Sequence, residues 1–371
     1  MRFARLACAC TLAAAAIPAG AQQTTAADVR RLLGALAHDS MEGRATGTPG
    51  ARRAATMIAD VMKRAGLTAA GDSGYFQRVA VTLDSVATPA MRRVPNGTDS
   101  AGRPAFRMEP TGGPPVVRVS YRVRGALAAL DTVPAGRRVS AVNVVATIPG
   151  SDPALAHEHV LVDAHYDHLG IGRAVDGDSI YNGADDDASG TVAVLEIARQ
   201  IARGPKPRRT VVFMATIGEE RGLLGTRWYI AHPTLPLAEM AANLEIEMIG
   251  RPDSLAGGPG RAWLTGYERS SMGDALAAAG IPIVPDKRLD QNFFQRSDNI
   301  AFAQVGIPAH TLSSFNLHTD YHRPSDDVAK VDAEHMATVI NAAVKAVRLL
   351  SDGPKPTWKP GGRPAPAPQR P

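Results

Sequence analysis

Five clusters of histidine, aspartate and glutamate stand out in the sequence, and each follows or interrupts a short apolar run. They are His165-Tyr166-Asp167-His168, Asp185-Asp186-Asp187, Glu219-Glu220, Glu245-Ile246-Glu247 and the segment 318–326. Imidazole and carboxylate groups together suit borderline cations such as Zn²⁺. The sequence therefore predicts a metal centre assembled from residues that lie far apart in the chain.

Each cluster alone has a simpler explanation, because aspartates often cap helices and paired glutamates are often solvated. Three consecutive carboxylates repel one another, however, and a dication would relieve that repulsion more than a helix N-terminus could. Adjacent glutamates can divide the work of catalysis, one as a ligand and the other as a general base. A carboxylate within an apolar strand is costly unless it is paired or bound to metal, and alternation places Glu245 and Glu247 on one face.

Continuous apolar runs alternate with helical segments from residue 142 onward, which is typical of a mostly parallel sheet covered on both faces. We therefore predict a three-layer α/β/α sandwich with a mixed, mostly parallel central sheet. The predicted strands are 142–148, 159–164, 210–216, 244–249 and 309–313. The predicted helices are 28–38, 50–66, 189–203, 223–231, 272–279, 298–305 and 332–350. Ligands bind at the carboxyl ends of strands in such sheets, where the polar clusters lie.

Three segments fall outside this pattern. Residues 1–21 combine early positive charge, an apolar run and the sequence Ala19-Gly20-Ala21, which predicts a secretory signal peptide cleaved after Ala21. Residues 72–138 are rich in proline, glycine and arginine and are predicted to form an irregular insertion or a β-rich excursion. Residues 353–371 are proline-rich without apolar periodicity, which predicts a disordered tail.

Composition excludes several classes of protein. Cys8 and Cys10 lie in the predicted signal peptide, so the processed chain would have no disulfide and no thiolate ligand. The N-terminal apolar run is too short to span a bilayer, so no stable membrane insertion is expected. Loss of Arg2 and Arg5 leaves 39 basic against 36 acidic residues, a net charge of +3, and the basic residues are scattered. Nucleic acid is therefore not an expected partner, and we expect a secreted or periplasmic protein of undetermined oligomeric state.

Taken in order, the clusters resemble those of the family-28 metallopeptidases, the co-catalytic zinc aminopeptidases and their relatives. The resemblance begins with Asp39-Ser40-Met41-Glu42-Gly43-Arg44, continues through 46–50 and runs to Asp326. It is most specific in 181–190 and at Glu219-Glu220. The resemblance implies a zinc-dependent aminopeptidase that hydrolyses N-terminal residues from peptides, with the peptidase domain spanning 22–352, and the predicted signal peptide implies that it is secreted. Residues 72–138 are too few for the protease-associated domain that many relatives insert there, so that domain is predicted to be absent.

The resemblance also implies a role for individual residues. The ligands of two zinc ions would be His165, Asp186, Glu220, Glu247 and His322. The catalytic residues would be Glu219 as general base, Tyr321 as a substrate-polarising hydroxyl and Asp167 as the partner that orients His165. Asp186 is chosen as the bridging ligand because the family's aspartate lies three residues before the serine of Ser-Gly. Glu247 stands where most members have aspartate. His318 lies close to His322, which the spacing favours.

The implied reaction is attack by a zinc-activated water on the peptide carbonyl, with Glu219 moving the proton to the leaving amine. One alternative is a single-zinc enzyme that resembles glutaminyl cyclase, although the motif from Asp186 to Gly190 is typical of the hydrolases. Another is a non-catalytic binding domain, although all five ligand positions hold competent side chains. Dipeptidase or carboxypeptidase action on the same fold is a third alternative, which the sequence leaves open.

Overall fold

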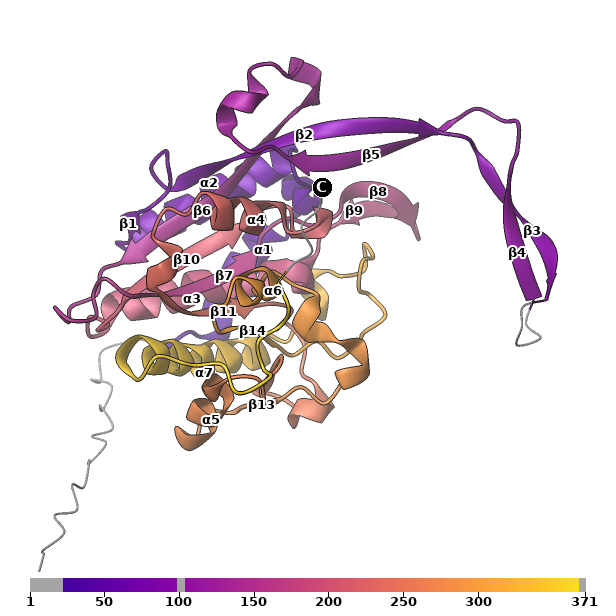
Figure 1. Cartoon of the computed structure of the whole chain (residues 1–371). Helices are drawn as coiled ribbons and strands as arrows, with labels where there is room; N and C mark the ends of the chain where they lie inside the picture. The colour runs from indigo at the N-terminus through magenta and orange to yellow at the C-terminus, as the bar shows by residue number, and fades with distance from the viewer. Residues whose placement is uncertain (1–22, 99–103, 367–371) are drawn as a thin grey trace, which may run out of the picture.

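A ten-stranded mixed sheet runs through the middle of the protein (Figure 1). The computed structural model describes residues 23–98 and 104–366, so the predicted signal peptide lies outside the described residues. The strands of the sheet are β1 (Thr68–Ala69), β2 (Phe76–Thr88), β5 (Val116–Val123), β6 (Arg138–Ile148), β7 (His159–His165), β10 (Thr210–Thr216), β11 (Met240–Ile246), β12 (Ala262–Leu264), β13 (Ile283–Pro285) and β14 (Ala309–Ser313). Their order is β13-β12-β14-β11-β7-β10-β6-β2-β5, and β1 pairs with β6.

The four strands β14, β11, β7 and β10 are parallel neighbours, and antiparallel strands flank them at β12 and β6. All seven residues of β7 are buried, as expected for a strand covered on both faces. The predicted mixed sheet with a parallel centre is confirmed. Because these strands point the same way, their carboxyl ends lie along one edge of the sheet.

Helices cover both faces of the sheet. One apolar core joins the sheet to α1 (Ala26–Leu36), α2 (Pro49–Arg64), α3 (Gly190–Arg203) and α7 (Ala333–Asp352). A second core on the other face joins it to α4 (Leu224–Ala231) and α6 (Asn299–Gln304), while α5 (Ser271–Ala278) packs beside β13. Neighbouring residues of one strand divide between the cores, as Val160 and Leu161 do. None of the described helices combines the length and the apolarity needed to cross a membrane.

Strand β11 begins and ends earlier than the prediction of 244–249. It runs from Met240 to Ile246, so Glu247 follows the strand instead of lying within it. Glu245 remains buried in the strand, where its carboxylate accepts hydrogen bonds from the Thr311 hydroxyl (2.6 Å) and from the backbone N–H of Asn299 (3.1 Å). The carboxylate of Glu245 thus finds its hydrogen-bond donors at the start of α6 and in β14. Glu247 lies beyond the strand, at the edge of the sheet.

The segment 72–138 forms strands. Strand β2 pairs with β6 through residues 76–82 and with β5 through 81–88, so its outer half belongs to a two-stranded ribbon. Beyond this ribbon, β3 (Met91–Thr98) and β4 (Pro104–Pro110) form a second antiparallel pair. Figure 1 shows the whole ribbon projecting from the body and bending back at its far end. We call the described residues of 83–121 the arm.

The proline-rich tail is ordered where the structure describes it, which corrects the prediction of disorder from residue 353. Trp358 pairs with Ser270 in an isolated β-bridge, and its indole N–H donates to the backbone oxygen of Gly306 (2.9 Å). The ring also packs edge-on against Phe294. One aromatic residue therefore anchors a segment whose composition is otherwise typical of disorder, and residues 367–371 lie outside the described part.

Candidate metal centre

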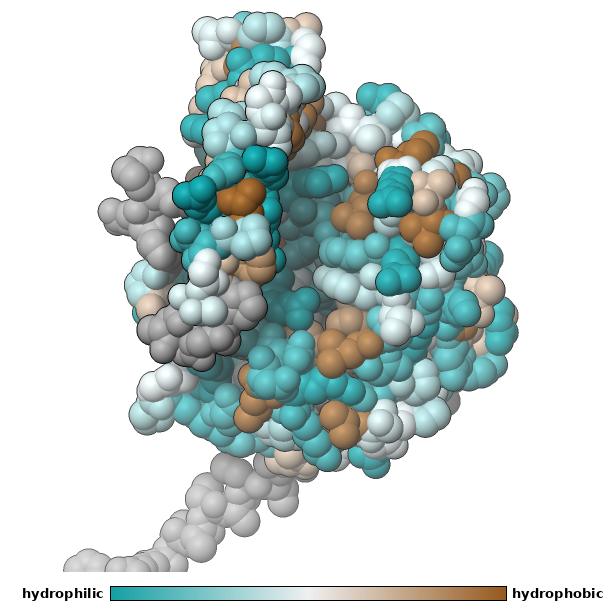
Figure 2. Space-filling view, turned by 90° about the vertical axis from the view of Figure 1, so that its right-hand side faces the viewer, coloured by the Kyte–Doolittle hydropathy of each residue, from teal (hydrophilic) through white to brown (hydrophobic). Residues whose placement is uncertain are grey.

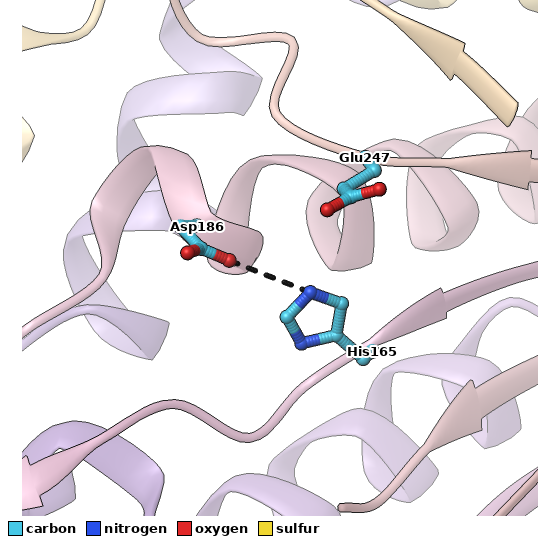
Figure 3. A group of neighbouring side chains, drawn as sticks. All are labelled: His165, Asp186 and Glu247. Atoms are coloured by element: carbon cyan, nitrogen blue, oxygen red, sulfur yellow. Dashed lines mark ion pairs between the residues drawn. The ribbon is translucent and has the colours of Figure 1, made fainter. Parts of the chain in front are cut away.

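The edge of the sheet brings the polar clusters together. His165 ends β7, Glu219 and Glu220 follow β10, and Glu247 follows β11. Two groups of potential ligands result, His165 with Asp186 and Glu247, and His168 with Asp186 and Glu220. Within each group the ligand atoms lie within 4.8 Å of one another. Figure 3 shows the three side chains of the first group pointing toward one another. Asp186 belongs to both groups, so the two sites would share one carboxylate.

The imidazole of His165 is oriented for a cation. Its Nδ1 lies 3.1 Å from the backbone oxygen of Asp167, an atom that can only accept, so Nδ1 donates. Nε2 lies 3.4 Å from Asp186 Oδ1 and has no hydrogen-bond partner among the described residues. Burial lowers the pKa of His165, but Glu219 and the neighbouring aspartates outweigh it and raise that pKa well above its usual range. The surrounding carboxylates therefore favour a positive charge at Nε2, which a bound metal ion would supply.

A second histidine, His322, lies beside the second group. His322 Nε2 lies 3.1 Å from Asp186 Oδ2 and 3.3 Å from Glu220 Oε1, while His168 Nδ1 lies 2.9 Å from Glu220 Oε1. Burial alone would raise the pKa of Glu220, but the two imidazoles lower it below its usual range. His168 was not among the predicted ligands. The sequence signal that could have identified it is its position three residues after His165, in the loop that follows β7.

The three consecutive aspartates divide their work. Asp187 Oδ1 accepts from the backbone N–H of Gly190 at the start of α3 and from that of Met248, both at 2.9 Å. Asp185 accepts from Gly250 N–H (2.7 Å) and lies 3.0 Å from His318 Nε2. Only Asp186 faces both ligand groups. The structure thus places His322 rather than His318 beside the shared carboxylate, as the spacing favoured.

Two buried charged residues hold the aspartate segment in place. The carboxylate of Asp326 accepts from the backbone N–H groups of Asp185 (3.1 Å) and Asp186 (3.0 Å). The fully buried guanidinium of Arg44 donates to four backbone oxygens, including those of Asn182 (2.6 Å) and Gly183 (2.9 Å). The motif at 39–44 therefore acts by fixing the backbone that leads into Asp186.

Asp167 has a different task from the one expected. Its carboxylate is 3.9 Å from His165 Nδ1, and the backbone oxygen of Asp167 makes the hydrogen bond to that ring instead. The carboxylate is occupied by three other donors, Thr46 Oγ1 (3.0 Å) and the backbone N–H groups of Gly218 (2.7 Å) and Glu219 (3.2 Å). Asp167 therefore couples His165 to the loop that carries Glu219.

Buried acids crowd this edge of the sheet. Burial, with Glu245 as the next cause, raises the pKa of Glu247 to about 8, and burial raises the pKa of Glu219 well above its usual range. Negative charges so close together are costly at low dielectric unless a cation neutralises them. A dication would reverse these shifts, because it favours the ionised form of every carboxylate around it. The donor set thus fits metal ions.

A cleft opens beside the first ligand group. Its lining includes three carboxylates, a guanidinium and four aromatic side chains, which belong to Asp186, Glu219, Glu247, Arg296, Trp263, Phe293, Phe315 and Tyr321. Tyr321 stacks on the His322 ring with 3.9 Å between centroids. Burial raises the pKa of Tyr321 well above its usual range, so its hydroxyl stays protonated and can donate a hydrogen bond. Aromatic side chains together with convergent polar groups are typical of a small-ligand site.

We predict that His168→Ala and His318→Ala differ in their effect on metal binding. His168 contacts a proposed ligand, whereas His318 contacts Asp185, outside both groups. The His168 variant should bind zinc at the group that contains Glu220 at least tenfold less tightly, and the His318 variant should bind as the parent does. Competition with a fluorescent zinc chelator measures both. Equal affinities in the two variants would show that His168 supports no metal site.

Comparison with known proteins identifies similarity to a peptidase family and to zinc metalloproteases. A model described as peptidase family M28 matches residues 143–347, just over half of the chain. A probable zinc metalloprotease of Pyrenophora teres f. teres is 37% identical over 112 residues, which cover 30% of this chain and 23% of the relative. The match spans about a fifth of the length of several curated relatives, among them vacuolar membrane proteases of Sclerotinia sclerotiorum and Penicillium rubens.

Solved structures share the fold. A zinc aminopeptidase from Bacillus subtilis superimposes with a TM-score of 0.59 at 19% identity, covering 89% of this chain and 96% of that one. A glutaminyl cyclase from Porphyromonas gingivalis superimposes with a TM-score of 0.54 at 13% identity, covering 87% of this chain and 97% of that one. The fold therefore accommodates both proteins, and the chemistry must be argued from the site.

Proposed function

The chain belongs to peptidase family M28, and from this membership we propose that it is a secreted aminopeptidase that binds two zinc ions and removes N-terminal residues from peptides. That it is a zinc metallopeptidase follows from the family and from its relatives. The number of zinc ions, the preference for a free N-terminus and secretion through the predicted signal peptide are the parts that we propose. The sharing of Asp186 by two ligand groups is the observation that carries the two-metal proposal.

We assign the candidate ligands to two ions. His165 and Glu247 would hold one ion, His322 and Glu220 would hold the other, with His168 beside Glu220, and Asp186 would be shared by both. When bound, zinc ions supply Lewis acidity, which polarises a peptide carbonyl and acidifies water. The glutamate at 247, one methylene longer than the usual aspartate, still reaches the group that contains His165.

The protein's own groups complete the chemistry. Glu219 lines the cleft, and the bond from its N–H to Asp167 fixes its backbone. We assign it the general-base role, in which it takes a proton from the attacking water and delivers it to the leaving amine. Tyr321, which also lines the cleft, can donate to the substrate's carbonyl oxygen as that oxygen gains negative charge. The carboxylates of the lining suit a protonated amino terminus, and its aromatic rings suit an apolar first side chain.

Zinc titration of the metal-free protein tests the proposal. We expect hydrolysis of leucine p-nitroanilide to rise until two equivalents of zinc are bound per chain, and N-acetylated leucine p-nitroanilide to be inert. Maximal activity at one equivalent, together with cyclisation of an N-terminal glutamine, would favour the cyclase alternative. Equal cleavage of the free and acetylated substrates would remove the preference for a free N-terminus.

A further inference from the structure

The far end of the arm is a ribbon with two unlike faces. The register of β3 and β4 places Met91, Pro95, Phe106 and Met108 on one face, together with Arg93, whose guanidinium lies 3.7 Å from the centre of the Phe106 ring. The opposite face carries Arg92, Val94, Arg107 and Glu109, and both arginines form ion pairs with Glu109. One face is therefore apolar and the other is charged.

The apolar face lacks a partner among the described residues. Met91, Phe106 and Met108 are 44%, 43% and 58% exposed. A two-stranded ribbon with nothing packed on it is marginally stable in water. Large apolar side chains gathered on one exposed surface usually mark a site of interaction. This face thus has the character of a binding surface.

The arm begins at the metal centre. Tyr121, in the part of β5 that belongs to the arm, has the Arg221 guanidinium 5.4 Å from its ring centre, and Arg221 directly follows Glu220. The Tyr121 hydroxyl also donates to the backbone oxygen of Thr46 (3.5 Å), whose side chain binds Asp167. The root of the arm therefore contacts the loop that carries the proposed general base and the residue that holds it.

Figure 2 looks onto the end of the molecule where the arm hangs and shows a groove between the arm and the body. The surface that the β3–β4 ribbon turns to the viewer is predominantly hydrophilic. Because the ribbon has one charged and one apolar face, the apolar face is turned toward the groove. An apolar surface thus borders the groove, on the side of the body where β8 (Gly170–Val175) and β9 (Asp178–Tyr181) follow the end of β7 (Figure 1).

We propose that the apolar face of the arm binds the carboxyl-terminal part of an extended peptide substrate, through apolar side chains several residues downstream of the bond that is cut. The inference rests on the proposed function. A peptide whose first residue occupies the cleft can extend from this edge of the sheet along the groove to the arm (Figure 1). The arm would then add affinity for longer apolar peptides without touching the reacting atoms.

Kinetics with short and long substrates test this proposal. The variant Phe106→Ser/Met108→Ser alters the apolar face, and Val94→Ser is a matched control on the opposite face. In a second arm variant, an Asn-Gly turn replaces residues 89–115 and joins the paired ends of β2 and β5. For a decapeptide with an N-terminal leucine and apolar residues downstream, both arm variants should raise KM roughly three- to tenfold with kcat unchanged. Leucine p-nitroanilide should be hydrolysed as by the parent, which also shows that the variants fold.

Three results would overturn the inference. The first is an unchanged KM for the decapeptide in both arm variants, and the second is an equal loss with the Val94 control. The third is a dimer on size exclusion that the arm variants abolish without a change in peptide kinetics, since the occupant would then be a second copy. If the parent protein with zinc bound hydrolyses neither the anilide nor the decapeptide, the proposed function fails. If the parent hydrolyses the anilide, the proposed function stands and the comparison of variants tests only the arm inference.

Discussion

Replacing Glu219 with glutamine should lower kcat by a factor of roughly 10²–10⁴ and leave the zinc content unchanged. The amide has almost the shape of the carboxylate, so the loop should stay in place, with its backbone N–H still bonded to Asp167. It cannot, however, take a proton from water. Glu219 belongs to neither ligand group, so no metal ligand is lost.

The neighbouring residue provides the matched control for this experiment. Glu220→Gln changes the same functional group one position along the same loop, but it removes a ligand of the second group. We expect this variant to lose about one zinc ion, whereas Glu219→Gln should retain both. Steady-state kinetics and elemental analysis on the same samples measure the two effects. Full activity in Glu219→Gln would exclude the residue as the base, and loss of zinc there would make it a ligand.

The sheet could be predicted from the sequence because its signals are local. Strands such as β7 and β10 are continuous apolar runs between polar loops, and their observed bounds match the predicted ones to within a residue. Parallel packing of such runs places His165 and the Glu219-Glu220 pair at one edge. The strand bounds and their parallel packing therefore suffice to predict that histidine and glutamate side chains meet at this edge.

The division of labour within the site could not be predicted in the same way. The family resemblance selected Asp186 among the three adjacent aspartates, but the physical reason lies in the fold, where backbone donors at Gly190, Met248 and Gly250 bind the other two. The carboxylate of Asp167 was expected to orient His165 but is bound to Thr46 and the loop after β10. His168 likewise becomes a candidate ligand only through the fold. Partners distant in sequence decide each of these roles.

The arm shows another limit of sequence analysis. Its outer strands contain Pro95 and several arginines, which weaken the usual strand signal. Pairing between β3 and β4 and ion pairs across the ribbon support it, and neither is visible in a short window of sequence. The run 116–123, which forms β5, is more apolar and therefore carries a stronger local strand signal.

Replacing Asp186 with asparagine should remove both zinc ions, whereas Glu247→Gln should remove only one. Asp186 Oδ1 lies 3.4 Å from His165 Nε2 and Oδ2 lies 3.1 Å from His322 Nε2, so the two oxygens face different groups. An amide offers one neutral oxygen in place of two charged ones, and neither ion would keep its carboxylate. Because zinc contributes several kcal/mol of transition-state stabilisation, activity should fall by at least about a thousandfold.

Stability measurements separate this loss of metal from a loss of fold. Asparagine keeps the backbone N–H that Asp326 binds, so the metal-free variant should unfold within a few degrees of the metal-free parent. Zinc should then raise the unfolding temperature of the parent and leave that of Asp186→Asn unchanged, since only a protein that binds the ion is stabilised by it. Glu247→Gln should show an intermediate rise. If Asp186→Asn instead retained one tightly bound zinc ion, the two groups would not depend on a common carboxylate, and a single metal would have to account for the chemistry.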